Sequence, residues 1–118
     1  MSAGMIVLVV LNTAVSVGGM GFAAVAAARP TTLSHGDSST KGERLYAWMY
    51  AIRGIPFGLL TAVVPFLEHG PAAVLCLLAA AVAQVGDAWI GVHRHENRQI
   101  VGPTLAAVIH LITAIAIS

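Results

Sequence analysis

The sequence predicts an all-α integral membrane protein in which four transmembrane helices form one domain, residues 1–118. Of the 118 residues, 58% are hydrophobic and only 9% are charged, whereas soluble domains carry roughly 25% charged residues. A soluble domain of this size buries a small share of its surface and could not hide so much apolar area. The apolar residues also fall into four long stretches separated by short polar breaks. These observations together favour a helical bundle in lipid.

The four stretches are expected to be helices at about 3–28, 45–67, 71–93 and 101–118. A helix needs roughly 20 apolar residues to cross the hydrocarbon core. The first three stretches meet that length, and the fourth lies at its short end. Open strands cannot satisfy their backbone groups in lipid, so helices are favoured. We expect the first stretch to be a retained helix, because no Lys or Arg precedes it and it is longer than a usual signal-peptide core.

The basic residues of the polar breaks predict the orientation. They lie in the first and third breaks, whereas the second break and both termini contain none. Lys and Arg favour the cytoplasmic side of a membrane. We therefore expect loop 29–44 to be cytoplasmic, both termini to lie outside, and the membrane to be a bacterial plasma membrane. The basic residues of these two breaks are Arg29, Lys41, Arg44, Arg94 and Arg98.

Two charged residues fall inside the expected helices. Arg53 lies nine residues after Arg44, and Asp87 lies seven residues before Arg94. At about 1.5 Å per residue, both side chains should lie roughly 10–14 Å inside the cytoplasmic boundary. Each costs roughly 2.5–3.5 kcal/mol at such a position on insertion scales. The short second break makes the two helices antiparallel neighbours, so an Arg53–Asp87 ion pair is expected, either as a structural contact or as part of a functional site.

Further polar and aromatic residues can join this pair. Tyr46, Tyr50 and Arg53 share one face of the second helix, and Gln84 shares a face of the third helix with Asp87. Tyr50 is a candidate catalytic residue beside Arg53 and Asp87. Gln84 and Tyr46, together with Trp89, are candidate contacts for a bound substrate. Tyr46 also fits the interfacial aromatic belt, as do the tryptophans.

Two polar residues lie deeper in the first and fourth helices. His110 should lie roughly 18 Å from the cytoplasmic edge. Its imidazole can donate and accept protons near neutral pH, which makes it a candidate catalytic residue, although a histidine bonded to a carbonyl or hydroxyl is also common. Asn12 is a candidate substrate contact, with an interhelical hydrogen bond as the alternative.

Small residues indicate close helix packing. Gly54 and Gly58 form a G-x-x-x-G pattern in the second helix, and Gly18 and Gly19 place small groups in the first. Such residues let helix backbones approach closely. Pro56 removes a backbone hydrogen bond beside Arg53 and is expected to kink the second helix. These rows of small residues would also suit contacts between copies of the chain in a homo-oligomer.

The remaining polar groups form no recognised cofactor or metal signature. The run at 93–96, His-Arg-His-Glu, has too few companion ligands for a metal site. Cys76 has no intrachain partner for a disulfide or a thiolate cluster. A net charge of +1 gives no reason to expect nucleic-acid binding. We expect no metal and no cofactor, and membrane lipid and a lipophilic small molecule as partners.

Residues 44–118 resemble the small bacterial and fungal membrane family catalogued as domain of unknown function 4267. The resemblance is carried by AIRGIPFG at 51–58, by Gly-Asp-Ala at 86–88 and by His110. It implies four helices with an arginine in the second and an aspartate in the third. It implies no particular activity, although members near biosynthetic genes would suggest work on lipophilic metabolites.

Three functions are compatible with these residues. The first is an enzyme that performs acid–base isomerisation, cyclisation or epoxide opening on a lipophilic metabolite, with Asp87 as the acid or base. The second is a transporter or binding subunit for a small molecule. The third is a structural partner protein. Small multidrug exporters are similar in size, but they use an acid in the first helix, where this chain has Asn12. Carotenoid-type cyclases carry an acidic Pro-x-Glu-Glu signature that the run at 65–68, Pro-Phe-Leu-Glu, does not match.

Overall fold

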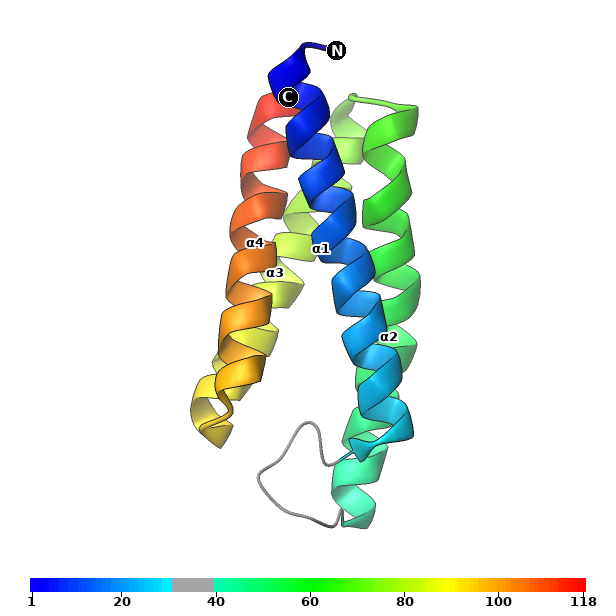
Figure 1. Cartoon of the computed structure of the whole chain (residues 1–118), viewed down its shortest axis with the longest axis vertical. Coiled ribbons are helices and arrows are strands. Elements are labelled where there is room, and N and C mark those ends of the chain that lie inside the picture. Colours follow the sequence, from blue (N-terminus) through cyan, green and yellow to red (C-terminus); the bar gives the residue numbers. More distant parts are fainter. Residues whose placement is uncertain (31–39) are drawn as a thin grey trace.

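The computed structural model describes residues 1–30 and 40–118. They form four helices, namely α1 (Ala3–Ala28), α2 (Lys41–Leu67), α3 (Pro71–Arg94) and α4 (Asn97–Ile117) (Figure 1). Each helix is long and apolar enough to cross a membrane. The expected all-α membrane bundle is therefore confirmed. The expected loop 29–44 lies largely outside the described residues.

Two helices begin earlier than expected. α2 begins at Lys41 rather than at Leu45, because the Thr40 hydroxyl accepts a hydrogen bond from the Glu43 N–H at 3.1 Å and caps the helix. Thr40 and Glu43 have the spacing of a capping box. Polar residues thus form the first turn of α2, and a reading based on hydropathy misses them.

α4 likewise begins at Asn97 rather than at Val101, so Pro103 lies inside the helix. The α3–α4 connection is very tight. His95 adopts a left-handed conformation with φ 55°, and the Glu96 N–H donates to the Gly91 carbonyl at 3.0 Å. A Cβ on Gly91 would lie 2.7 Å from the Gln99 backbone, so this connection requires glycine at that position.

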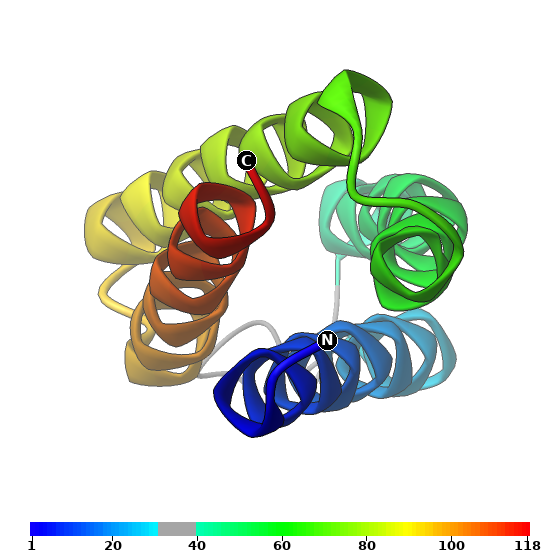
Figure 2. The ribbon, with the colours of Figure 1, turned by 90° about the horizontal axis from the view of Figure 1, so that it is seen from above.

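The helices pair as two hairpins. α1 packs mainly along α2, and α3 packs mainly along α4, whereas α2 and α3 make few contacts with each other. The two hairpins meet through α1 and α4 (Figure 2). In Figure 1 they lie together at the upper end and diverge toward the lower end. We call the upper end, with both termini and the turn 68–70, the terminal end, and the lower end, where the helices carry Lys41, Arg94 and Arg98, the basic end.

The glycines of α2 hold the first hairpin together. A Cβ on Gly58 would lie 2.5 Å from Met20 Cγ and 3.2 Å from the Ser16 carbonyl oxygen. A Cβ on Gly54 would lie 3.5 Å from the Ala23 Cβ. The predicted close approach along the G-x-x-x-G pattern is therefore confirmed, with α1 as the partner.

The packing role predicted for Gly18 and Gly19 is wrong. A Cβ on either residue would have no neighbour within 4 Å, so no helix approaches α1 at these positions. The physical reason is that α1 and α4 diverge there, and both glycines line an open groove between them.

The outer surface of the bundle is strongly apolar. Large side chains on all four helices are exposed, including Leu67 at 76% and Val82 at 73%. A monomeric soluble protein rarely exposes apolar patches of this extent. Lipid tails are as apolar as these side chains, so the surface carries no penalty in a bilayer.

Candidate functional site

Arg53 and Asp87 form an ion pair between α2 and α3, as the sequence predicts. Arg53 Nη2 donates a hydrogen bond to Asp87 Oδ1. The Asp87 side chain is 7% exposed, whereas that of Arg53 is 49% exposed. The second carboxylate oxygen, Oδ2, accepts no hydrogen bond from the described residues. The pair joins the two hairpins where α2 and α3 otherwise make little contact.

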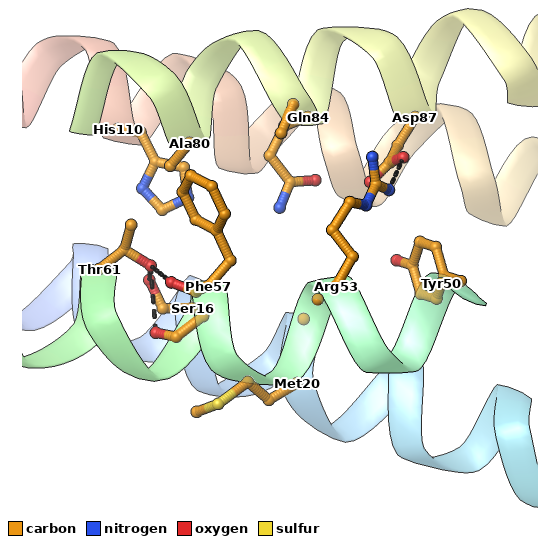
Figure 3. Close-up of a pocket in the computed structure, with 14 residues that line it drawn as sticks. Ser16, Met20, Tyr50, Arg53, Phe57, Thr61, Ala80, Gln84, Asp87 and His110 are labelled. Carbon is orange, nitrogen blue, oxygen red and sulfur yellow. Dashed lines mark hydrogen bonds and ion pairs between the residues drawn. The ribbon is translucent and has the colours of Figure 1, made fainter. Parts of the chain in front are cut away.

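The pair lines a small cavity between the hairpins, with both polar and apolar residues in its wall (Figure 3). Ala80, Gln84 and Asp87 lie on one face of α3, because they are spaced by four and three residues. In Figure 3 the Gln84 side chain lies between His110 and Asp87 and points toward α2. The cavity has a volume of about 40 Å³, which is room for a few water molecules. The polar groups therefore border open space instead of being packed against one another.

His110 lines the far side of this cavity and is held by a hydrogen-bond network. The Asn12 amide Nδ2 donates to the Thr61 carbonyl oxygen at 2.8 Å, and Asn12 Oδ1 lies 2.7 Å from His110 Nδ1. A carbonyl only accepts, which fixes the orientation of the amide. Nδ1 of His110 must therefore carry the proton and donate it to Asn12. In the neutral ring, Nε2 is then free to accept a hydrogen bond.

The Thr61 carbonyl takes part in this network because of Pro65. A proline has no N–H, so the carbonyl four residues before it loses its helical hydrogen bond. Asn12 supplies the missing donor from α1. The Ser16 hydroxyl adds a hydrogen bond at 2.8 Å to the Asn12 carbonyl and lies 3.1 Å from the Thr61 hydroxyl. Thr61 was not among the expected site residues, although its position four residues before Pro65 was a usable signal.

The two tyrosines of α2 have different positions. Tyr50 is buried, lines the cavity and packs edge-on against Phe22, with ring centroids 6.1 Å apart. Tyr46 accepts a hydrogen bond of 2.6 Å from the Gln99 amide of α4. It thus lies one turn closer to the basic end and links the hairpins there. Gln99 was missed because the sequence assigned it to a polar turn, not to a helix.

Trp89 and Asn12 are not brought to the cavity. Trp89 is 64% exposed on the outer face of α3, and its ring packs against His93 with centroids 4.6 Å apart. This position fits the aromatic belt better than substrate contact. Asn12 is fully buried, and both its amide oxygen and its amide nitrogen are hydrogen-bonded to protein atoms. Its position matches the interhelical alternative.

A larger apolar groove lies beside the cavity, between α1 and α4. Its volume is about 630 Å³, within the range of roughly 300–1,000 Å³ typical of small-molecule sites. Gly19, Tyr50 and Gln84 line both the groove and the cavity. The polar site is therefore adjacent to a space large enough for a small apolar molecule.

Within residues 1–30 and 40–118, no group of three or more His, Cys, Asp or Glu side chains is placed to hold a metal ion. No protein-family model, curated protein or solved structure matches this chain. The resemblance of residues 44–118 to domain of unknown function 4267 therefore stays a prediction.

Proposed function

We propose that the cavity and the adjoining groove form an intramembrane site for a lipophilic small molecule, at which Asp87 exchanges a proton with the bound molecule. The observation that carries this proposal is the position of the Arg53–Asp87 pair in the wall of a cavity between two loosely joined hairpins. Ionisable residues inside membranes are expensive and commonly mark functional sites. A purely structural pair would be expected to lie in tight packing.

The geometry suits an acid–base reaction. Arg53 holds Oδ1 of Asp87 and favours the ionised carboxylate, which leaves Oδ2 to act on a ligand. Oδ2 would take a proton from a carbon that lies between a carbonyl group and a C=C bond, and the electron pair would spread over the carbonyl oxygen and the far carbon of that double bond. Return of the proton to the far carbon moves the double bond next to the carbonyl and completes an isomerisation. Tyr50, Gln84 and His110 Nε2 are placed to orient the polar atoms of such a ligand.

We further propose that the basic end faces the cytoplasm of a bacterial cell and that both termini lie outside. All the basic residues of the two loops lie at this end, and Lys and Arg favour the cytoplasmic side. In this orientation the Arg53–Asp87 pair lies in the inner leaflet. A ligand would reach it from the lipid through the groove between α1 and α4.

A hydrogen-exchange experiment tests the reaction without a known substrate. The protein, purified in lipid nanodiscs, is incubated in D₂O with a panel of long-chain ketones, and deuterium incorporation is measured by mass spectrometry. The wild-type protein should accelerate incorporation into at least one ketone. Asp87→Asn should lower that rate by about 100-fold or more, as expected for loss of a general base.

Glu68→Gln is the matched control, because it also removes one acidic group from the chain. Glu68 lies at the terminal end and caps α3 through the Ala73 N–H, a bond that a glutamine oxygen can also accept. This variant should exchange at the wild-type rate. If Asp87→Asn exchanged as fast as the Glu68→Gln control, Asp87 would not be the base.

A binding or carrier subunit without turnover is the second candidate, favoured by the divergence of the two hairpins toward the basic end. The same nanodisc samples distinguish a carrier from an enzyme. A carrier would retain a lipophilic ketone in an Asp87-dependent manner, measured by equilibrium binding, and would incorporate no deuterium.

A further inference from the structure

We propose that the groove between α1 and α4 binds a single-chain amphiphile, with its acidic headgroup at Arg98 and its apolar chain directed into the membrane. This inference rests on the proposed function, because it names the substrate class of the same site. The groove runs along α4 from Arg98 to Leu105 and is bordered on α1 by Gly18 and Phe22. Its wall is mainly apolar, so it favours a hydrocarbon chain.

Glycines keep the groove open. A Cβ built on Gly18, Gly19 or Gly102 would meet no atom within 4 Å, although glycines in membrane helices commonly serve close packing. Gly58 of α2 serves such close packing, because a Cβ at this position would clash with Met20. The glycines of the groove therefore border empty volume on both of its sides.

The charge of the groove selects an acidic headgroup. Arg98 is the one charged side chain among the described residues that line it. Asn97 lies next to it and can donate a further hydrogen bond. A guanidinium binds carboxylate and phosphate groups with two parallel hydrogen bonds. A carboxylate or phosphate at the membrane surface would therefore be held at this end.

The length of the groove favours one short chain over a bilayer phospholipid. Arg98 and Leu105 are seven residues apart, or about 10 Å along the helix. Each of the two chains of a phospholipid extends through half of the hydrocarbon core, or about 15 Å. A single chain that follows the groove passes Tyr50 and Gln84, which also line the cavity of Asp87. A reactive group part-way along the chain would then lie beside the proposed base.

Photolabelling in nanodiscs tests this assignment. The probes are a diazirine-bearing eight-carbon fatty acid and the corresponding fatty alcohol, and labelled residues are mapped by mass spectrometry. We expect the acid to label the groove, and to do so about fivefold more than the alcohol, because one basic residue near the membrane surface contributes about 1 kcal/mol of attraction. Equal labelling by both probes, or labelling spread over all exposed helix faces, would overturn the proposal.

Two pairs of variants locate the binding determinants. Gly18→Leu should fill the groove and lower its labelling by about tenfold. Gly21→Leu, on an exposed face of the same helix and with equally open Cβ space, should have no effect. Arg98→Gln should remove the preference for the acid, whereas Lys41→Gln, which removes an exposed charge at the same end, should retain it. If the paired variants behaved alike, the assignment would be wrong.

Competition and Asp87→Asn distinguish the remaining outcomes. Octanoate should displace the probe, and added phosphatidylglycerol should not. Displacement by the phospholipid would mean that the groove holds bilayer lipid, which contradicts the proposal.

Labelling should be unchanged in Asp87→Asn, because Asp87 does not line the groove. A failed exchange test with intact labelling would therefore reject the proposed reaction alone, and the reverse result would reject the amphiphile alone.

Discussion

The two ends of the bundle use polar residues in opposite ways. Toward the terminal end, Asn12, Thr61 and His110 join α1, α2 and α4 through hydrogen bonds between fully buried groups. Toward the basic end, Arg53 and Asp87 form an ion pair in the wall of a cavity, and Asp87 keeps one oxygen without a partner in the described chain. The first arrangement fixes the position of the helices. The ion pair leaves one carboxylate oxygen of Asp87 free to act on a ligand beside open volume. This difference distinguishes a candidate site from a structural contact.

This comparison predicts that changes at the basic end alter activity, whereas changes at the terminal end alter stability. The largest expected effect is that of Arg53→Gln. Without the guanidinium, Asp87 is less readily ionised, and the deuterium exchange of the wild-type protein should fall by about 100-fold, equivalent to about 2.7 kcal/mol. The free energy of unfolding, measured in detergent mixtures, should fall by less than about 1 kcal/mol, because Asp87 can take up a proton when its partner is lost, so that no unpaired charge stays buried. A loss of stability with unchanged exchange would reverse the assignment of the two ends.

Asn12→Leu should produce the opposite result. It leaves the Thr61 carbonyl and the His110 Nδ1–H without partners, which should lower the free energy of unfolding by about 2 kcal/mol. Deuterium exchange per folded molecule should fall by much less than in Arg53→Gln, because Asn12 acts on the cavity only through His110. Thr13→Val is the control, because it removes one hydrogen bond to the Ala62 carbonyl from the same helix and should cost only about 0.6 kcal/mol.

The role of Pro65 permits a rescue experiment. Pro65→Ala restores a backbone N–H that can donate to the Thr61 carbonyl within α2. In the Asn12→Leu background this change should recover about 1 kcal/mol of unfolding free energy, the usual net value of one hydrogen bond. In the wild-type background it should recover nothing, because Asn12 already satisfies that carbonyl. Equal effects in both backgrounds would show that the two residues are not coupled.

The smallest expected effect is that of Tyr46→Phe. It removes the hydroxyl that accepts from Gln99 and so weakens one link between α2 and α4 at the basic end. We expect a loss of about 0.6 kcal/mol in the free energy of unfolding, the average for a hydrogen bond between membrane helices. Exchange should be retained, because Tyr46 does not line the cavity. A large drop in exchange would make Tyr46 part of the site.

Much of the candidate site could be predicted because charged residues are rare in apolar helices. Arg53 and Asp87 stood out by composition, and equal depth on two neighbouring helices was enough to pair them. Thr61 and Gln99 were missed, because hydroxyl and amide side chains are unremarkable in a sequence and acquire a role only through a partner from a distant helix. Pro56 was expected to matter because it lies beside Arg53. The proline with an observed effect on the hydrogen bonds between helices is Pro65, which frees the Thr61 carbonyl to accept from Asn12 of α1.

The order of residues was enough to indicate a four-helix membrane protein with an Arg–Asp pair between the second and third helices. Segment length, hydropathy and the energetic cost of a charge in lipid depend on short stretches of the chain, so they can be judged from the sequence. The arrangement of the helices was needed to show that Gly54 and Gly58 pack tightly on α1 while Gly18 and Gly19 border an open groove. The same residue type serves both purposes, and the difference depends on the angle between helices, which is set by the summed contacts of the whole bundle.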